Sequence, residues 1–282
     1  MNDNYVITQM SRDELSTAIA WAEREGWNPG LHDIDCFYHT DPQGFFAGKL
    51  DGKIIAVGSA VIYDEQFAFC GFYMVDAAYR GQGFGLALTK ARLKYIGERN
   101  AGLDGVIPMV EKYARLGYRI AYNNARYCGA TKSNNTLKNK AIIPLAQINF
   151  EQLVTYDRRY FPARRESFLT CWINQVGGKS LGYCRHGELL GYGVIRPCKQ
   201  GFKMGPLFAE NVQIADELFM QLAHHAKGQP VSLDIPECNP FARDLVKRHQ
   251  LEKVFETARM YLKKAPAVEM DHIYGITSFE LG

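Results

Sequence analysis

Several features that would place a chain in a special class are missing from this sequence of 282 residues. It contains no run of roughly 18 apolar residues, the length that a membrane-spanning helix requires, and its first residues show no basic stretch followed by an apolar core. Lysine and arginine form no block of the kind that binds nucleic acid, and the formal net charge is only +3. We therefore expect a cytoplasmic protein that binds neither membranes nor nucleic acid.

Cysteine is sparse and follows no pattern. The seven cysteines are an odd number, are widely spaced and include no Cys-x-x-Cys pair, so neither a disulfide framework nor a zinc site is indicated. None has a histidine partner that the sequence identifies, so a cysteine nucleophile is not expected either. We expect free thiols and no metal ion.

The composition is that of a chain that can form packed cores. Hydrophobic residues make up 47% and charged residues 22%, which is usual for soluble proteins. The length suits two domains of about 140 residues each. The polar, turn-prone stretch TKSNNTLKNK at residues 131–140 predicts the linker. The predicted domains are therefore residues 1–130 and 141–282.

Both halves of the sequence predict strands and helices in the same order, which suggests a duplicated module. Ser11 and Glu14 form a capping-box pattern that opens a helix ending near Arg24. In the first half we further predict strands at 5–8, 45–50, 53–63, 66–76, 105–108 and 119–128, and helices at 33–39, from 83 and at 111–116. In the second half we predict strands at 141–146, 180–185, 188–196, 202–207, 230–235 and 253–262, and helices within 149–174 and at 212–226 and 240–249.

Three glycines in five residues, Gly81, Gly83 and Gly85, separate a predicted strand from a predicted helix. Such a turn points free backbone N–H groups and the positive end of the helix dipole at one place, which suits a phosphate. Glycine fits because side chains would block the approach or forbid the backbone angles. The alternative is a strand-to-helix turn in which the glycines only allow the backbone angles and no phosphate binds. The spacing matches neither the dinucleotide fingerprint nor a P-loop.

Residues 75–85, VDAAYRGQGFG, resemble the signature of the GCN5-related N-acetyltransferase (GNAT) superfamily, Q/R-x-x-G-x-G/A after a strand. The resemblance implies that the N–H groups of this loop hold the pyrophosphate of acetyl-coenzyme A, and that the edge of the preceding strand pairs with its pantetheine arm. The implied binding residues are Tyr73, Met74, Val75, Arg80, Gly81, Gln82, Gly83, Phe84, Gly85 and Leu86.

A second motif, YARLGY at residues 113–118, is similar to the family's Y-x-x-x-G-F, with Tyr in place of Phe. It implies that Tyr113 is the general acid that protonates the departing coenzyme A thiolate. The structural alternative for Tyr113 is an aromatic side chain packed on its helix. The family's asparagine shortly before this helix is absent here.

The resemblance implies an α/β fold of the α+β kind, with two tandem GNAT-type domains, each a mixed, mostly antiparallel twisted sheet flanked by helices. Weaker matches extend it along the chain to a bacterial tandem-GNAT group whose C-terminal half is a second acetyltransferase-like domain. These matches are WNPG at 27–30, GFF at 44–46, GLDGV at 102–106 and IYGITSFELG at 273–282.

The second half lacks both the glycine loop and the tyrosine motif. GPLFAENVQ at residues 205–213 contains no glycine after Gly205, Val246 stands where the first half has Tyr113, and Gln250 replaces the glycine that follows. We therefore predict that the C-terminal domain binds no acetyl-coenzyme A and covers or completes the acceptor site instead.

The sequence thus predicts an enzyme that moves an acetyl group to a primary amine of a small molecule, or of a peptide, by direct attack without a metal. A lysine-like amine is neutral only about once in 2,500 at pH 7, so some group must assist its deprotonation. Asp33, Glu111, His32 and a relay of waters remain open as the base, with a solvated-surface or helix-cap role as the alternative for each residue. We expect Asp33 and Trp27 to contact the acceptor, with packing in an aromatic core as the alternative for Trp27.

Two other functions remain open at this point. A non-catalytic acyl-coenzyme A sensor would keep the glycine loop and not use Tyr113. A tandem-GNAT peptidyl or long-acyl transferase would also pair two such domains, although the intact pyrophosphate loop speaks against it. The chain is expected to be a monomer or a homodimer.

Overall fold

A computed structural model describes residues 4–130 and 139–282 of the chain. The first half contains strands β1 (Tyr5–Gln9), β2 (Phe45–Leu50), β3 (Lys53–Ile62), β4 (Phe67–Val75), β5 (Asn100–Val106) and β6 (Arg119–Ala130), with helices α1 (Arg12–Arg24), α2 (Asp33–Thr40), α3 (Phe84–Ile96) and α4 (Val110–Arg115). The second half contains strands β7 (Ile142–Pro144), β8 (Lys179–Arg185), β9 (Glu188–Pro197), β10 (Phe202–Ala209), β11 (Pro230–Pro236), β12 (Glu252–Tyr261) and β13 (Ile273–Gly275), with helices α5 (Phe150–Asp157), α6 (Glu166–Trp172), α7 (Val212–Ala223) and α8 (Pro240–Arg248). The predicted linker at 131–140 lies outside the described residues, except for its last two positions.

Most of the predicted elements are present within a residue or two of their predicted bounds. The capping box is confirmed, because the Ser11 hydroxyl accepts from the Glu14 N–H and the Glu14 carboxylate accepts from the Ser11 N–H. The predicted strand at 105–108 was misplaced, since β5 covers residues 100–106. Its sequence, NAGLDGV, has low strand propensity, and β5 forms because it pairs with β4 on one side and β12 on the other. The short strand β13 was not predicted.

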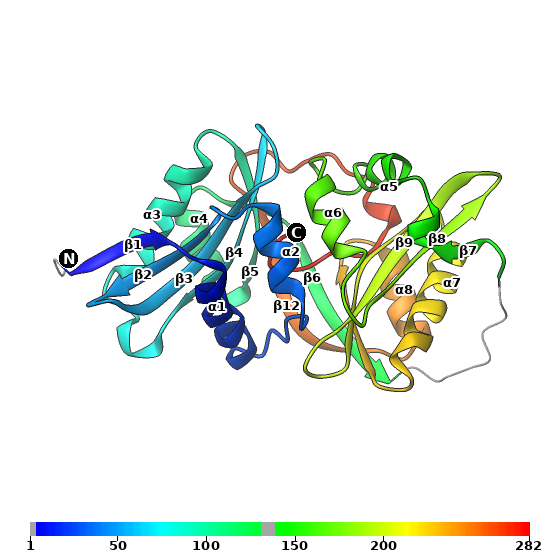
Figure 1. Ribbon diagram of the computed structural model, residues 1–282, viewed down its shortest axis with the longest axis horizontal. Helices are drawn as coiled ribbons and strands as arrows, with labels where there is room; N and C mark the ends of the chain where they lie inside the picture. Colours follow the sequence, from blue (N-terminus) through cyan, green and yellow to red (C-terminus); the bar gives the residue numbers. More distant parts are fainter. Residues whose placement is uncertain (1–3, 131–138) are drawn as a thin grey trace.

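The strands form one continuous sheet in the order β1-β2-β3-β4-β5-β12-β6-β11-β10-β9-β8-β7, with β13 paired to β10 beside this path (Figure 1). We call strands β1–β5 and β12 the N-terminal lobe, and strands β7–β11 and β6 the C-terminal lobe. In each lobe the fourth and fifth strands run parallel, and all other neighbours along the path run antiparallel. This mixed, mostly antiparallel sheet flanked by helices confirms the predicted fold class.

The two lobes exchange their last strands. Strand β6 ends the first half of the sequence but pairs with β11, and β12 ends the second half but pairs with β5. The two exchanged strands also pair with each other, over residues 252–261 of β12. The sequence predicted both strands but not their exchange, because periodicity shows which residues pair with a neighbour and not which neighbour it is.

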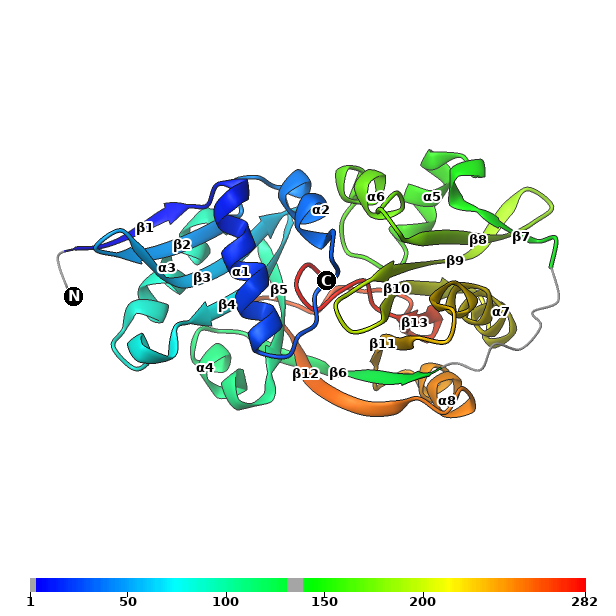
Figure 2. The same ribbon diagram turned by 60° about the horizontal axis from the view of Figure 1, so that its bottom comes forward.

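The helices cover both faces of the sheet. Helix α3 packs on β2, β3 and β4, and α7 packs in the same way on β8, β9 and β10 (Figure 2). Between the lobes lies a core to which both halves of the chain contribute. There the Phe37 ring stacks on Trp172 with 6.0 Å between ring centroids and meets Phe72 edge to face at 5.6 Å. Full burial of one such side chain stabilises the fold by roughly 1.5–3 kcal/mol, so these contacts join the lobes firmly.

Cys36 on α2 and Cys171 on α6 form a disulfide bond between the two halves. The expectation of free thiols was therefore wrong for this pair. The spacing of cysteines in the sequence could not identify this disulfide bond, because the two cysteines are 135 residues apart and meet only through the packing of α2 on α6. The other five cysteines are free, as predicted. Among the described helices, none combines the length and the apolar character that crossing a bilayer demands.

Candidate functional site

The parallel strands β4 and β5 separate halfway along. Their pairing ends at Cys70 and Leu103, although β4 continues to Val75. A bulge in the pairing of β4 with β3 accompanies the separation, and Phe72 within it takes a φ of 49°. The β5-facing edge of β4 beyond Cys70 is therefore open to an extended ligand, which could be added there as a further strand. The predicted residues Tyr73, Met74 and Val75 lie on this part of β4.

Each glycine of the loop between β4 and α3 has a physical reason to be glycine. Gly81 and Gly83 have φ values of 80° and 89°, in the left-handed region that favours glycine, and no atom approaches the place of a side chain. Gly85 allows close packing instead, because a Cβ there would lie 2.2 Å from the Tyr73 hydroxyl oxygen and 2.9 Å from Val75 Cγ2, and these side chains would have to move. The two reasons together explain the Gly-x-Gly-x-Gly spacing.

The loop leaves backbone N–H groups free at the start of α3. Gly83 is the N-cap and offers no side chain to these groups. Within the described ranges, no group accepts a hydrogen bond from the amides of residues 81–86. Arg80 is engaged elsewhere, since its Nε donates to the Val75 carbonyl at 2.8 Å and its Nη2 pairs with Glu25 at 2.8 Å. Free amides at the N-terminus of a long helix favour an anion.

The corresponding part of the C-terminal lobe is closed. Helix α7 begins with Asn211, whose side chain accepts from the Ile214 N–H at 3.0 Å and so caps the helix. Strand β13 pairs with Leu207 and Phe208 of β10, beyond the point where β10 and β11 stop pairing. An extended ligand would meet the chain's own strand there.

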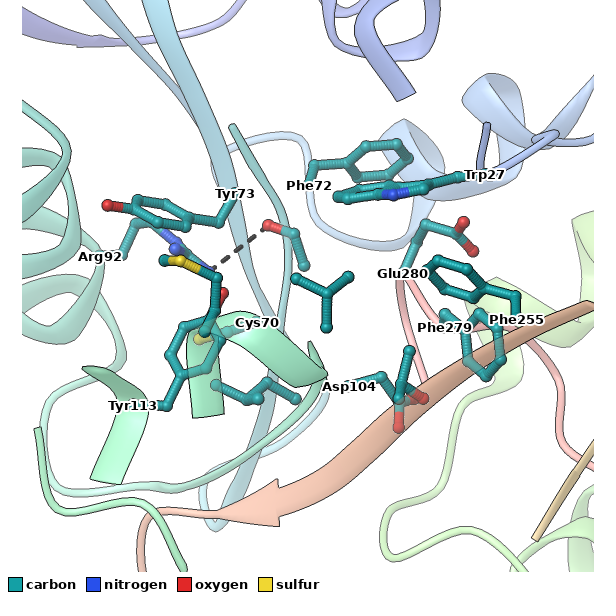
Figure 3. A pocket seen from close by; sticks show the side chains of 15 residues that line it. Trp27, Cys70, Phe72, Tyr73, Arg92, Asp104, Tyr113, Phe255, Phe279 and Glu280 are labelled. Carbon is teal, nitrogen blue, oxygen red and sulfur yellow. Dashed lines mark hydrogen bonds between the residues drawn. The ribbon is translucent and has the colours of Figure 1, made fainter. Parts of the chain in front are cut away.

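A cavity lies in the opening between β4 and β5, where the two lobes meet (Figure 3). The cavity has a volume of about 50 Å³, so only a slender group enters without side-chain movement. Its walls are mostly apolar and aromatic, with a few polar groups. The lining residues are Trp27, Cys70, Gly71, Phe72, Tyr73, Arg92, Leu103, Asp104, Val106, Met109, Tyr113, Phe255, Thr257, Phe279 and Glu280.

Tyr113 reaches this cavity from α4. Gly105 makes room for its ring, because a Cβ on Gly105 would lie 2.9 Å from Cδ2 of the tyrosine. Tyr73 meets the same ring edge to face, with 6.4 Å between centroids. Burial raises the pKa of Tyr113 to about 12, and the nearby Arg92 cation opposes this rise. The phenol therefore carries its proton at neutral pH.

Of the charged side chains that line the cavity, Asp104 is fully engaged. It accepts hydrogen bonds from Arg259 Nε at 3.0 Å and Nη2 at 2.7 Å, and from the Asn124 side chain at 2.8 Å. A carboxylate held in this way is not free to act on a ligand. Asp104 therefore joins β5 to the exchanged strands β6 and β12.

Arg92 and Glu280 are the other two charged side chains in the wall. Arg92 is buried and donates to the backbone carbonyls of Ser59, at 2.8 Å, and Gly71, at 3.4 Å, and no described carboxylate pairs with it. Glu280 is 2% exposed, and its Oε1 has no hydrogen-bond partner within the described chain. No sequence motif marked Glu280 as a site residue, although a carboxylate among the apolar and small residues at 273–282 was a signal that could have identified it.

The other residues singled out from sequence lie in different places. Trp27 lines the cavity. Asp33 does not, because it is fully buried in an ion pair with Arg196. Glu111 is exposed on α4 and His32 precedes α2, and neither of them lines the cavity. The structure thus brings Trp27, Tyr73 and Tyr113 together and separates them from the three residues considered as the base.

Both halves of the chain match one family of enzymes. Residues 12–118 match the family described as "Acetyltransferase (GNAT) family", and residues 153–275 match the "Acetyltransferase (GNAT) domain". The holothin acyltransferase of Pseudoalteromonas sp. (strain SANK 73390) is 30% identical over 273 residues, which cover 96% of this chain and 92% of the relative. An uncharacterised N-acetyltransferase of Bacillus subtilis is 22% identical over 85% of this chain and 86% of its own.

Solved structures share the fold over the full length. A proposed acetyltransferase of Pyrococcus horikoshii superposes with a TM-score of 0.84 at 19% identity, covering 100% of this chain and 97% of that one. A tandem GNAT protein from the clavulanic acid biosynthesis pathway gives a TM-score of 0.63 at 13% identity, covering 93% and 99% of the two chains. With the family matches in both halves and the relative that is 30% identical, these findings establish that the chain belongs to the GNAT superfamily and is an acetyltransferase with two such domains in tandem.

Proposed function

We propose that this enzyme transfers the acetyl group of acetyl-coenzyme A to a primary amine of a small molecule, by direct attack on the thioester, with Tyr113 as general acid. The observation that carries the proposal is a continuous path in the N-terminal lobe. It leads from the free amides at the start of α3, along the open edge of β4, to the cavity that holds the protonated Tyr113.

The residues along this path fit acetyl-coenzyme A, which is the cosubstrate of the GNAT family. The amides of residues 81–86 would hold the pyrophosphate, because they point outward without partners and a helix begins behind them. The edge of β4 from Tyr73 to Val75 would hold the pantetheine arm as a neighbouring strand does. Bound in this way, the cosubstrate supplies a thioester whose carbonyl carbon accepts the amine.

Tyr113 would give its proton to the sulfur as the C–S bond breaks. With a pKa of about 12 against about 8.5 for a thiol, transfer to a fully formed thiolate would be uphill by about 5 kcal/mol. Donation during bond breaking avoids that cost, because the sulfur gains charge only as the bond lengthens. A positioned acid of this kind contributes typically about 10²–10⁴ in rate.

The acceptor side of the cavity supports an amine carried by an apolar body. Trp27, Phe72, Phe255 and Phe279 form one side of the cavity, opposite Tyr73 and Tyr113 (Figure 3). Flat apolar groups bind well between aromatic rings. The printed name of the relative, holothin acyltransferase, supports a small-molecule acceptor as well.

The closed C-terminal lobe supports a single site for each chain. The Asn211 cap and strand β13 occupy the places that correspond to the phosphate loop and the open strand edge of the N-terminal lobe. We propose that the C-terminal lobe binds no acetyl-coenzyme A, and that the C-terminal half of the chain instead forms part of the acceptor cavity, to which it contributes Phe255, Phe279 and Glu280.

The loss of thioester absorbance during incubation with a panel of acceptors tests this proposal. The panel contains polyamines, amino acids, aminoglycosides and aryl or arylalkyl amines, with acetyl-coenzyme A as the donor and longer acyl-coenzymes as comparison. We expect turnover with an amine of the last group. Binding of acetyl-coenzyme A without turnover on any amine would favour a sensor instead.

A further inference from the structure

The last ten residues of the chain connect the two lobes. After β13 has filled the opening of the C-terminal lobe, the chain crosses to the N-terminal lobe, and its end lies between them (Figure 2). Every residue from 273 to 282 is buried. The Tyr63 hydroxyl donates to the Leu281 carbonyl at 2.8 Å, and Ser278 accepts from the Gly282 N–H at 3.1 Å. This segment, which we call the tail, is thus a fixed part of the site.

Gly71 sets the position of Glu280 within the tail. A Cβ on Gly71 would lie 2.1 Å from the backbone carbonyl oxygen of Glu280, so only glycine lets the tail lie against β4 at this point. Gly71 follows Cys70, where the pairing of β4 with β5 ends. The tail therefore places Glu280 at the open edge of β4, and its side chain lines the same cavity as Tyr113 (Figure 3).

The charges around Glu280 leave its carboxylate available. Arg126 and Lys203 are the cations that interact with it, but neither forms an ion pair with it in the described chain. Arg126 is held by Asp234 at 2.6 Å and 2.8 Å, and Lys203 donates to the Trp27 carbonyl at 3.2 Å. The titratable groups that face Glu280 or share its cavity are Cys70, Tyr73, Arg92, Asp104, Tyr113, Arg126, Lys203 and Asp234.

A buried carboxylate oxygen without a partner is unfavourable unless a ligand supplies the hydrogen bond. Of the carboxylates in the cavity wall, Asp104 accepts three hydrogen bonds, whereas Oε1 of Glu280 accepts none within the described chain. An ammonium group offers three N–H donors and the opposite charge. The cavity thus holds one place suited to a cationic amine.

We propose that Glu280 binds the ammonium group of the acceptor and takes its proton, so that the tail of the C-terminal half of the chain completes the active site of the N-terminal lobe. The inference rests on the proposed function. The carboxylate accepts one proton from the ammonium nitrogen, which then attacks the thioester carbonyl. The C–N bond forms, the C–S bond breaks, and Tyr113 gives its proton to the sulfur. After the C–N bond has formed, the nitrogen loses a second proton, which passes through solvent to the Tyr113 oxygen and restores the phenol. The proton on Glu280 passes to water after the product departs.

The same geometry indicates the class of acceptor. Arg92 is a buried cation in the cavity wall without a described carboxylate partner, so a second positive charge on the acceptor would be repelled. The aromatic residues opposite Tyr113 favour an apolar body. The acceptor is therefore a monoamine whose single primary amine is attached to an apolar, flat group, rather than a polyamine.

The pH profile of kcat/KM for the acceptor tests this role, with Glu280→Gln compared to the unchanged chain. Wild-type kcat/KM should stay level below the pKa of the amine, about 10.4 for an alkylamine, because the carboxylate deprotonates the bound ammonium. Glu280→Gln can use only the free amine, so its kcat/KM should fall about tenfold for each pH unit below the amine's pKa and approach the wild-type value above it. A level profile in the variant overturns the inference.

Matched variants separate this role from a structural one. Glu252→Gln makes the same change at the exposed start of β12 and should keep the wild-type profile. If Glu280→Gln fails to fold, Glu280→Gln with Lys203→Met removes one charge of each sign, and the same sloped profile is expected. Acetyl-coenzyme A affinity should change less than threefold in Glu280→Gln, and a larger loss of affinity together with a level profile would show a structural role only. If the unchanged chain acetylates no amine, the proposed function falls and this inference falls with it.

Discussion

Asp33 of α2 and Arg196 of β9 form an ion pair in which neither side chain is exposed, with 2.7 Å between Oδ1 and Nε. Arg196 also donates from Nη2 to Oδ2 at 3.2 Å, and its guanidinium lies 4.2 Å from the ring centre of Trp172. The partners come from the two halves of the sequence. The pair therefore holds in register the two lobes whose meeting creates the cavity.

Replacement of Asp33 by Asn should destabilise the protein strongly. Removal of one partner from a buried ion pair typically costs about 3–5 kcal/mol, because the remaining charge loses its partner without gaining water. Unfolding in urea measures the change. Asp35→Asn is the matched control, since Asp35 lies on the same helix and pairs with Arg12 at the surface. A similar loss in both variants would contradict the role given to the buried pair.

Replacement of Tyr113 by Phe should lower kcat by about 10²–10⁴ while acetyl-coenzyme A still binds. The thermal midpoint should hardly change, because no described group forms a hydrogen bond with the Tyr113 hydroxyl. Steady-state kinetics and calorimetric titration with acetyl-coenzyme A measure the two effects. An undiminished kcat would remove Tyr113 from the mechanism.

In the proposed mechanism, the raised pKa of Tyr113 also sets the alkaline limit of the reaction. The general acid must be protonated, and burial keeps it so up to a pKa of about 12. Wild-type kcat should therefore not decline between about pH 8 and 10, although an ordinary tyrosine begins to ionise near 10. A decline of kcat with a midpoint near 9 would show that another group supplies the proton.

Gly81→Ala should weaken the binding of acetyl-coenzyme A. Gly81 has a φ of 80°, which costs an alanine about 1–2 kcal/mol and shifts the loop amides toward other angles. Gly52→Ala is the matched control, since Gly52 has a φ of 79° and equally open surroundings in the turn between β2 and β3. Both variants should lose similar stability, and only Gly81→Ala should raise the Kd of acetyl-coenzyme A. An equal Kd in both variants speaks against the loop as the phosphate site.

The disulfide between Cys36 and Cys171 predicts a definite thiol count. A chain unfolded without reductant should show five reactive thiols, and seven after reduction. The double replacement Cys36→Ala and Cys171→Ala should lower the free energy of unfolding by about 2–4 kcal/mol, because a long closed loop is released in the unfolded chain. Cys184→Ala removes a free, partly buried thiol and should have a smaller effect. Seven thiols before reduction would show that the bond does not form.

Gly71→Ala should displace the tail, because the added Cβ would overlap the Glu280 carbonyl and backbone cannot move aside cheaply. We expect a stability loss of about 1–3 kcal/mol and a larger loss in kcat/KM for the amine than in acetyl-coenzyme A affinity. Gly48→Ala on β2 is the comparison, since the added methyl there meets mainly the end of the Tyr5 side chain, which can turn away. Equal effects of the two variants would contradict the fixed position of the tail.

The parts of the site that sequence could predict are those built from neighbouring residues. The backbone angles at Gly81 and Gly83 and the start of α3 depend on a few consecutive positions, so the glycine loop was recognisable without a structure. The capping box at Ser11 was recognisable for the same reason. The position of strand β5 was predicted wrongly because its residues become a strand only between two partner strands. One of these, β12, pairs with residues of β5 that are 151 to 159 positions away in sequence.

The remaining parts of the site depend on residues that are distant in sequence. Asp33 resembled an acceptor-binding carboxylate until the fold placed Arg196 beside it. Glu280 lies in the stretch at 273–282 that matches the tandem-GNAT group, but no pattern there marked it as a site residue, and only the path of the tail along Gly71 brings it to the cavity. In both cases the chemical role of a carboxylate depends on which groups from elsewhere in the chain surround it.

By itself, the sequence determined the two GNAT-type modules, the glycine loop and the position of Tyr113 on a short helix. It also determined that the second half lacks both the glycine loop and the tyrosine. Only the tertiary structure decided the exchange of β6 and β12, the disulfide between α2 and α6, the filling of the C-terminal lobe by β13 and the delivery of Glu280 to the N-terminal lobe. The physical reason is that local backbone angles and helix starts are set within a few residues. Strand partners and buried charges are set by which distant surfaces can be packed together.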